Sequence, residues 1–317
     1  MRAIQISEFG GPEVLKLVDI PAPTAVVGEV LIEVSACGIN YADSHQAENS
    51  YLSPQTLPLI PGAEVVGRNA SGQRVVALVP GGGYAEVVSA PAALTFPIPD
   101  GVSDGAALAA ILQGTTAVHL LRTSAHLQDR ESVLVHAAAG GVGTIAVQLA
   151  KLWGAKVIGS ASSADKRELV SSLGADAVID PAEVDLTAAI VAANGGKKVN
   201  IVLEMTGGKV FDQSLQALAP FGRLVTFGMA SRSAPEPLQA GALMGTSRAV
   251  IGFWLAHCMA RPDRMIAPQL AELFELIESG KIKAVIGGSY PLSEAKRAHE
   301  DLRARKTIGK VFLDPKK

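Results

Sequence analysis

Residues Ser132 to Trp153 read SVLVHAAAGGVGTIAVQLAKLW. A short apolar run leads into a turn of small residues, Ala137 to Gly143, and a helical pattern follows the turn. A strand, a tight glycine turn and a helix in this order present helical N–H groups to a pyrophosphate. The apolar face of the helix is expected to comprise Val142, Ile145, Ala146, Leu149, Leu152 and Trp153. The stretch predicts a nucleotide-binding unit, and the alternative is a tight turn in an α/β enzyme that binds no nucleotide.

The turn matches the dinucleotide fingerprint G-x-G-x-x-G with an alanine in its first position, as Ala138-x-Gly140-x-x-Gly143. In this pattern, Gly140 lets the backbone approach the pyrophosphate and Gly143 lets the helix pack closely on the strand. The residues expected to contact the cofactor here are Ala138, Gly140, Gly141, Val142 and Gly143.

The residues that read the cofactor's ribose should lie about 20 positions further on, at the end of the next strand. A site that prefers NADH usually has an acidic residue there, whereas this chain has Gly159-Ser160-Ala161-Ser162-Ser163, followed by Lys166. Hydroxyl groups and an ammonium suit a 2′-phosphate, so Ser160, Ser162 and Lys166 favour NADPH. The alternative is that Ser162 or Ser163 only caps a helix and that Lys166 is solvated.

The organisation of the chain changes near residue 114. Residues 1–113 read as mostly β, with short apolar runs between Gly/Pro turns. Strand-like runs then alternate with helical patterns, which predicts a parallel sheet covered on both faces. The six expected strands are Ser132–His136, Lys156–Ser160, Ala177–Asp180, Val199–Glu204, Arg223–Phe227 and Ala249–Phe253. The tail, residues 256–317, is expected to return to the first domain, which makes residues 114–255 an inserted domain.

Composition excludes several classes of protein. Of the 317 residues, 48% are hydrophobic and 18% are charged, as in a well-buried globular protein. The net charge of −2 disfavours nucleic acid as a partner. The two cysteines, Cys37 and Cys258, lie far apart, which favours a reduced compartment without a disulfide framework. The polar N-terminus and the interrupted apolar runs argue against a signal peptide and a membrane span, so the protein is expected to be cytoplasmic.

Motifs in order along nearly the whole chain resemble those of a known family. They are CGINYAD at 37–43, LIPGAEVVG at 59–67, GYAE at 83–86, QGTTA at 113–117, the glycine turn and TIGKV at 307–311. In these, the chain resembles the zinc-free quinone oxidoreductase (zeta-crystallin-like) branch of the medium-chain dehydrogenase/reductase superfamily. The resemblance implies an α/β protein, with a six-stranded Rossmann cofactor domain inserted in a mainly β GroES-like catalytic domain and an active site in the cleft between them.

The resemblance also argues against a metal. Zinc-dependent relatives place a cysteine ligand where this chain has Asn40 and a histidine ligand where it has Ala63, and their cysteine-rich loop has no counterpart here. Catalytic zinc needs three protein ligands. We therefore expect no metal site, with Cys37 a buried apolar residue and Glu64 a structural carboxylate.

The resemblance implies three residues for the chemistry. Asn40 would lie beside the nicotinamide, or it would only hold a loop. His45, where many relatives carry tyrosine, could donate to a developing oxyanion, or it could be a solvated loop histidine. Tyr51 would line the acceptor pocket. Ala47 stands where relatives often have arginine, which leaves the substrate contact open.

Further cofactor contacts implied by the resemblance are Thr116, Phe227, Gly228 and Lys310, the last with a structural alternative. Met229 stands where many relatives have asparagine. Asp180 replaces a tyrosine that relatives use near the 2′-phosphate, and an acidic side chain would weaken NADPH binding there unless it points away. Arg297, His299 and Arg303 are expected on the solvated face of a helix.

These observations predict an NADPH-dependent oxidoreductase that passes a hydride to a quinone or an α,β-unsaturated carbonyl. The alternatives are an enoyl-thioester reductase, a low-turnover NADP(H)-binding sensor protein and, least supported, a zinc alcohol dehydrogenase. The sixth strand, Ala249–Phe253, carries few blunting charges, and the same edge commonly pairs with its twin in this superfamily, so a homodimer is expected.

Overall fold

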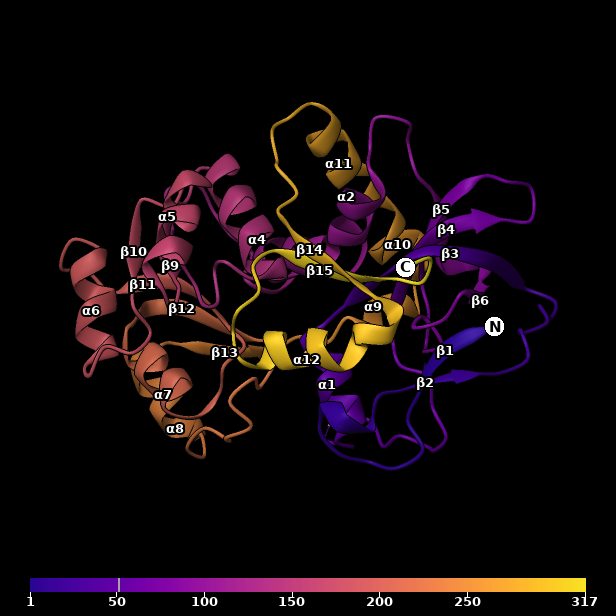
Figure 1. Ribbon diagram of the computed structural model, residues 1–317. Helices are drawn as coiled ribbons and strands as arrows, with labels where there is room; N and C mark the ends of the chain where they lie inside the picture. The colour runs from indigo at the N-terminus through magenta and orange to yellow at the C-terminus, as the bar shows by residue number, and fades with distance from the viewer. Residues whose placement is uncertain (51) are drawn as a thin grey trace. The chain divides into compact units, whose positions relative to one another are not determined.

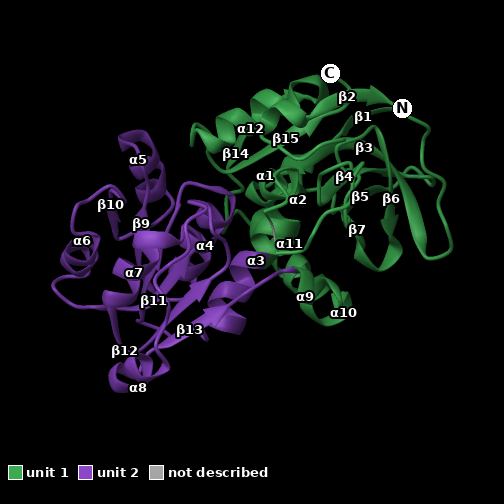
Figure 2. Cartoon of the chain, turned by 90° about the horizontal axis from the view of Figure 1, so that it is seen from below, with its two compact units in different colours: residues 1–115, 256–317 green, residues 116–255 purple. Residues whose placement is uncertain are grey.

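The computed structural model describes residues 1–50 and 52–317. The chain divides into two compact units, residues 1–115 with 256–317 and residues 116–255 (Figure 2). We call them unit 1 and unit 2.

The described residues of unit 2 form a six-stranded parallel sheet in the order β10-β9-β8-β11-β12-β13. Its core strands are rich in branched apolar residues, and Val133, Leu134 and Val135 are almost completely buried. The strands are β8 (Ser132–Val135), β9 (Lys156–Ser160), β10 (Ala177–Ile179), β11 (Val199–Glu204), β12 (Leu218–Thr226) and β13 (Ala249–Gly252).

Helices cover both faces of this sheet, with α4 and α5 on one face and α6 and α7 on the other (Figure 1). The helices are α4 (Gly141–Leu152), α5 (Ala164–Ser172), α6 (Leu186–Ala193), α7 (Gly208–Gln216) and α8 (Ala240–Thr246). The chain winds outward from β8 to β10 and then returns to β11, so the strand order reverses beside β8. Such a switch point is where open α/β sheets bind their ligands, and the glycine turn directly follows β8.

The buried face of α4 agrees in part with the expected one, because Ile145, Ala146 and Leu149 are buried as predicted. Gly143, Ala146, Val147 and Ala150 are buried and follow the i, i+3, i+4, i+7 spacing of one helical stripe. Leu152 follows Ile145 and Leu149 at i+7 and i+3, but it is the last residue of α4 and is 44% exposed, so its assignment to the buried face was wrong.

The described residues of unit 1 form a two-stranded ribbon and a seven-stranded sheet in the order β14-β15-β3-β4-β5-β7, with β6 paired to β3. The strands are β1 (Arg2–Gln5), β2 (Lys16–Asp19), β3 (Glu29–Ile39), β4 (Glu64–Asn69), β5 (Arg74–Leu78), β6 (Val87–Pro91), β7 (Thr95–Pro97), β14 (Ile286–Pro291) and β15 (Lys310–Asp314). β3 is the longest and pairs with β4, β6 and β15. The pairing of β15 with β3 returns the tail to the first part of the chain, as expected.

The helices of unit 1 are α1 (Tyr41–Ala47), α2 (Asp104–Leu108), α9 (Ala256–Met259), α10 (Pro262–Met265), α11 (Ala267–Glu278) and α12 (Ala295–Arg303), and α3 (Thr115–Val118) crosses the division between the units. π-helical turns at Ala109–Gly114 and His119–Ser124 flank α3. In the described part of the chain, no helix is both long and apolar enough to cross a membrane.

Candidate functional site

The turn after β8 can be built only with glycine at position 143. A Cβ placed there would lie 2.4 Å from the carbonyl oxygen of Ala137 and 2.6 Å from Cα of Ala138. These distances are below any normal Cβ contact, so the close packing of turn and helix depends on Gly143. Ala137 itself has a positive φ of 47°, and its carbonyl accepts the Gly140 N–H at 2.8 Å.

The same turn leaves donors free for a ligand. Gly140 is the N-cap of α4, and the first hydrogen bond of the helix runs from Thr144 N–H to the Gly140 carbonyl at 2.9 Å. The preceding N–H groups of the first turn, at Gly141, Val142 and Gly143, have no acceptor within the helix. Gly140, Gly141 and Val142 are half-buried, so an anion can approach them.

The carboxyl end of β9 lies against this turn, because Ala138 N–H donates to the Ser160 carbonyl at 3.0 Å. The Ser160 hydroxyl is buried and has no hydrogen-bond partner among the described residues. Ser162 is exposed, and Ser163 caps α5 by accepting from Lys166 N–H at 3.4 Å. The capping role therefore falls to Ser163, which leaves the hydroxyls of Ser160 and Ser162 available to a ribose.

Asp180 follows β10 and is held by Arg167, which was not among the expected site residues. Arg167 Nη1 donates to Asp180 Oδ2 at 2.8 Å and to the Ala161 carbonyl at 2.9 Å. The other Asp180 oxygen accepts Ala182 N–H at 2.9 Å. The acidic charge that disfavoured NADPH is thus paired with a guanidinium. Arg167 directly follows Lys166 in the sequence, but no local pattern pairs it with Asp180.

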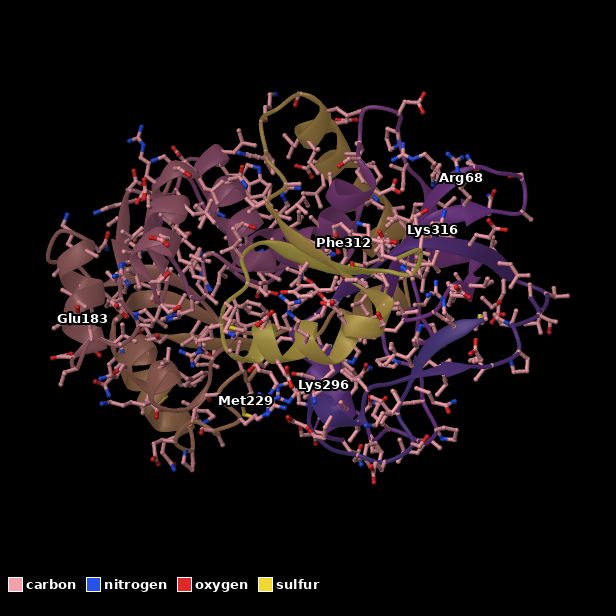
Figure 3. All side chains as sticks on the ribbon, in the orientation of Figure 1. Arg68, Glu183, Met229, Lys296, Phe312 and Lys316 are labelled. Atoms are coloured by element: carbon pink, nitrogen blue, oxygen red, sulfur yellow. The ribbon has the colours of Figure 1, made fainter. Side chains whose placement is uncertain are left out.

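Three expected cofactor residues lie elsewhere in unit 2. Thr116 is buried in α3. Phe227 donates its N–H to the Glu204 carbonyl at 3.0 Å, so that group is already in use, whereas Gly228 is exposed. Met229, on the same loop, is 41% exposed (Figure 3).

Glu204, which ends β11, is a buried carboxylate that sequence reasoning also missed. Its Oε1 accepts the N–H groups of Thr206 and Gly207 at 2.6 and 2.9 Å, whereas Oε2 has no partner among the residues described. Burial raises the pKa of Glu204. These bonds show that it organises the turn before α7.

In unit 1, Asn40 belongs to a buried polar cluster. Its Nδ2 donates to Glu64 Oε1 at 2.7 Å, and its Oδ1 accepts from Gln113 Nε2 at 3.0 Å and from Lys310 Nζ at 3.3 Å. Lys310 also forms an ion pair with Glu64 in which both side chains are completely buried. We call Asn40, Glu64, Gln113 and Lys310 the Lys310 cluster.

This geometry bears on two expected roles. The ammonium of Lys310 has no exposed surface and is paired with Glu64, so the structure favours its structural alternative over a contact with a cofactor phosphate. Glu64 is the structural carboxylate that was expected. The amide of Asn40 is committed to three partners, which favours a positioning role, and its contact with substrate stays a prediction.

A second chain of buried groups lies beside this cluster. Asp43 Oδ2 accepts Asn40 N–H at 2.8 Å and the Tyr84 hydroxyl at 2.9 Å, and that hydroxyl lies 2.9 Å from His299 Nε2. Burial raises the pKa of Asp43 to about 6 and lowers that of His299 to about 4. The expectation of a solvated His299 was therefore wrong, because α12 turns this residue inward toward Tyr84. Arg297 on the same helix is exposed, and Arg303 pairs with Glu48 at 3.0 Å.

His45 is neither in a loop nor solvated. It lies in α1, is only 7% exposed, and its Nδ1 is 3.0 Å from the Ser50 hydroxyl. The solvated-loop alternative is excluded, and the catalytic role is left as a prediction. Tyr51, the third expected residue, lies outside the described residues.

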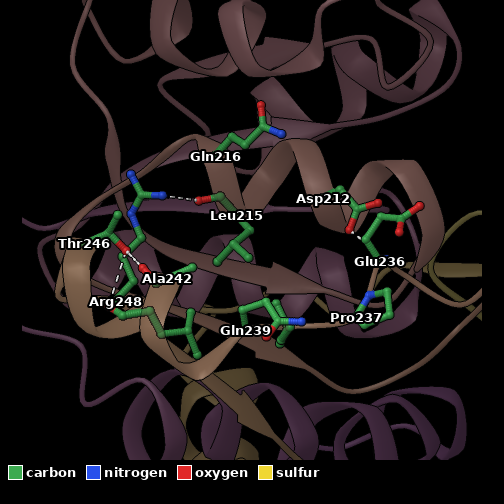
Figure 4. Close-up of a pocket in the computed structure, with 11 residues that line it drawn as sticks. Asp212, Leu215, Gln216, Glu236, Pro237, Gln239, Ala242, Thr246 and Arg248 are labelled. Atoms are coloured by element: carbon green, nitrogen blue, oxygen red, sulfur yellow. Dashed lines mark hydrogen bonds between the residues drawn. The ribbon is translucent and has the colours of Figure 1, made fainter.

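Two surface pockets of about 330 Å³ each lie away from the expected residues. One is formed by α7, α8 and the segment between Glu236 and Gln239, where Arg248 Nη1 donates to the Leu215 carbonyl at 3.0 Å (Figure 4). The other is lined by residues of α11 and by Phe96, Pro97 and Pro99. Among the residues that the structure describes, none that was expected to bind the cofactor or the acceptor lines either pocket.

Comparisons with known proteins agree with this arrangement. Residues 27–100 match the alcohol dehydrogenase GroES-like domain, and residues 141–275 match the family described as zinc-binding dehydrogenase. The chain is 36% identical over 330 residues to a quinone oxidoreductase of Rattus norvegicus, covering 99% of this chain and 97% of that protein.

Two solved structures show the same similarity. The quinone oxidoreductase of Escherichia coli complexed with NADPH superposes with a TM-score of 0.91 at 34% identity, covering 99% of this chain and 100% of that one. The quinone oxidoreductase of Thermus thermophilus, described with its NADPH complex, gives 0.88 at 38% identity with the same coverage.

One matched family is named for zinc, and the donor set of this chain does not fit that metal. Ala63 offers no donor, and the Asn40 amide nitrogen donates to Glu64. Burial raises the pKa of the Cys37 thiol well above its usual value, and the thiol donates to the Glu64 carbonyl. Among residues 1–50 and 52–317, no three His, Cys, Asp or Glu side chains are grouped so that they could hold a metal ion.

Proposed function

Because the chain belongs to the quinone oxidoreductase branch of the medium-chain dehydrogenase/reductase superfamily, we propose that it transfers a hydride from NADPH to a quinone or an α,β-unsaturated carbonyl. The observation that carries the proposal is the turn at the switch point, where Gly143 tolerates no Cβ and donors of the first helical turn stay free.

The residues at the end of β9 fit NADPH. The buried Ser160 hydroxyl lacks a partner among the described residues, Ser162 is exposed, and Asp180 is already paired with Arg167. A 2′-phosphate requires donors and cations, and this edge supplies them through Ser160, Ser162 and Lys166. Relatives from Escherichia coli and Thermus thermophilus have structures with NADPH, which supports the same choice.

Each group of residues has its own task in this proposal. The N–H groups of the glycine turn bind the pyrophosphate, and Thr116 and Gly228 contact the nicotinamide half. NADPH, when bound, supplies the hydride. Asn40, His45 and Tyr51 position the acceptor, with Asn40 held in place by the Lys310 cluster.

The choice of acceptor follows from the side chains present, which do not fit a zinc ion. A quinone takes up one hydride and one proton to become a hydroquinone, and a C=C bond conjugated to a carbonyl takes up the same pair. In the quinone, the oxygen that gains charge accepts the proton, and in the enone the enolate left by hydride transfer is protonated on carbon, in each case from water or a side chain. Orientation of the two reactants is the main requirement.

The direct test is consumption of NADPH, followed at its absorbance band, against quinones, enones and enoyl thioesters. We expect saturable turnover with at least one quinone and a lower kcat/KM with NADH in place of NADPH. Turnover with enoyl thioesters alone would replace this proposal with an enoyl-thioester reductase. NADPH binding without turnover of any acceptor would point to a sensor protein.

We also propose that the chain forms a homodimer through β13. This strand is the last in the sheet and pairs on one side only, with β12, among the described residues. It consists of Ala, Val, Ile and Gly, without the charges that protect a free edge.

A further inference from the structure

The ion pair of Arg167 and Asp180 lies where β9 and β10 end. Arg167 lies on α5 and reaches back to the ends of two neighbouring strands. Its Nη1 binds the carbonyl of Ala161, directly after β9, and the carboxylate of Asp180, directly after β10. Because β9 and β10 are parallel and Ser160 is paired with Ile179, both partners lie at the same edge of the sheet.

The Arg167 guanidinium has N–H groups that are not used in these two hydrogen bonds. Arginine has five N–H groups, and Nη1 carries two of them. The N–H groups on Nε and Nη2 make no hydrogen bond to the residues that the structure describes. The Arg167 side chain is 28% exposed, so these donors are accessible at the position where the ribose of a dinucleotide is read.

Both carboxylate oxygens of Asp180 already accept hydrogen bonds. Oδ2 accepts from Arg167 and Oδ1 accepts from Ala182 N–H. Such a carboxylate fixes a guanidinium in one orientation rather than competing for ribose hydroxyls. A planar guanidinium with free N–H groups is well suited to a phosphate.

We propose that Arg167 determines the preference for a 2′-phosphate, and that Asp180 is the positioning residue that holds its guanidinium at the end of β9. This inference rests on the proposed use of NADPH. On this proposal, Asp180 does not weaken phosphate binding as an acidic residue usually would. It supports phosphate binding by orienting the Arg167 guanidinium. Lys166, the neighbouring residue, adds a second positive charge.

The test measures binding without any hydride transfer. Adenosine 2′,5′-bisphosphate and adenosine 5′-monophosphate differ only in the 2′-phosphate, and their affinities are measured by calorimetry. The wild-type protein should bind the bisphosphate more tightly. Arg167→Gln should weaken the bisphosphate about tenfold and change the monophosphate less than twofold, since charge-assisted bonds to phosphate are strong. Lys197→Gln, an exposed lysine on the loop after α6, is the control for loss of one charge.

Asp180→Asn separates the two roles that an acid can have here. If Asp180 orients Arg167, the single variant weakens the bisphosphate by about threefold, and the same change made in Arg167→Gln tightens it. If Asp180 acts only as a repelling charge, Asp180→Asn tightens binding in both backgrounds, which would overturn the positioning role. Asp165→Asn, an exposed carboxylate on α5, is the matched control.

The outcomes also separate this inference from the proposed function. Equal affinity of the wild-type protein for both nucleotides contradicts the use of NADPH itself. A wild-type preference that survives Arg167→Gln leaves NADPH in place and overturns the role of Arg167. A purely structural tie between α5 and β10 would lower thermal stability and weaken both nucleotides alike.

Discussion

Lys310 and Glu64 place two opposite charges where no solvent reaches either side chain. Removing one partner of such a pair leaves a buried charge without compensation, which typically costs about 3–5 kcal/mol. Lys310→Met should therefore lower the free energy of unfolding by about that amount in urea denaturation. The double variant Lys310→Met/Glu64→Gln should lose less than the two single variants together, because neither charge remains. Lys316→Met, an exposed lysine near the C-terminus, should have little effect (Figure 3).

Asp43 gives the stability a pH dependence of defined sign. Its pKa rises from 3.8 to about 6 on folding, so its stabilising contribution is present below pH 4 and is lost as the pH rises through 6. From pH 5 to pH 8, the wild type should lose about 1–2 kcal/mol more than Asp43→Asn. Urea denaturation of both proteins at the two pH values measures this difference. Parallel behaviour of wild type and variant would contradict it.

Two buried histidines act in the opposite direction. The pKa values of His136 and His299 are lowered to about 4 by burial, so their contributions are present above pH 6.5 and are lost as the pH falls through 4. The comparison with Asp43→Asn, and not the wild-type curve alone, isolates the carboxylate. Asp165→Asn, an exposed aspartate, should follow the wild type at both pH values.

Local sequence patterns predicted the environment of some single residues and not of others. Cys37 was correctly expected to be buried, because its apolar neighbours in β3 set its environment. His299 and Arg167 depend on partners far along the chain or on another element, Tyr84 and Asp180 respectively. No local pattern reports such a partner, and the roles of both residues were missed for that reason.

At the scale of elements, the turn before α4 offers a sharp test. Gly143→Ala would bring a Cβ to 2.4 Å from the Ala137 carbonyl oxygen, so turn or helix must shift. We expect the affinity for adenosine 2′,5′-bisphosphate to fall at least tenfold and stability to fall by about 1–3 kcal/mol, the usual cost of overpacking. Gly241→Ala in α8, where an added Cβ meets nothing within 4 Å, should leave binding unchanged. Unchanged affinity in Gly143→Ala would show that the turn is not the pyrophosphate site.

The elements of unit 2 could be predicted closely because each has a strong local signal. The expected strand Lys156–Ser160 agrees with β9, and Val199–Glu204 agrees with β11, since both are branched apolar runs that end at polar or turn residues. The apolar face of α4 was extended too far because Leu152 keeps the helical spacing of the buried Ile145 and Leu149, although it is the last residue of the helix and is exposed. Hydrophobicity alone did not distinguish a buried leucine from an exposed one there.

For the molecule as a whole, the order of strands and helices along the chain predicted more of the fold than any single motif did. Alternation of strands and helices predicts a parallel sheet, and its strand order places the glycine turn at the switch point. The return of the tail to unit 1 depends on pairing between β15 and β3, some 270 residues apart in the chain, as between Val311 and Ile39. The return itself could be expected because it completes an otherwise open β unit, whereas no local pattern selects β3 as the partner strand.

The free edge of β13 leads to a prediction about assembly. Phe253 donates its N–H inward to Thr226 at 2.9 Å, so alternation along the strand turns the N–H groups of Val250 and Gly252 outward. Light scattering should therefore give a mass of twice the 32.7 kDa of one chain.

Val250→Pro removes one outward donor and leaves the inward hydrogen bonds of β13 in place, so it should shift the protein toward monomer. Val250→Leu keeps the donor and should remain a dimer. Circular dichroism and nucleotide affinity establish that the proline variant is folded, and a folded variant that remains dimeric would show that the contact lies elsewhere. A wild-type protein that stays monomeric across the micromolar range would contradict the dimer itself, because an uncharged edge of this kind gains ladder hydrogen bonds only when a second strand joins it.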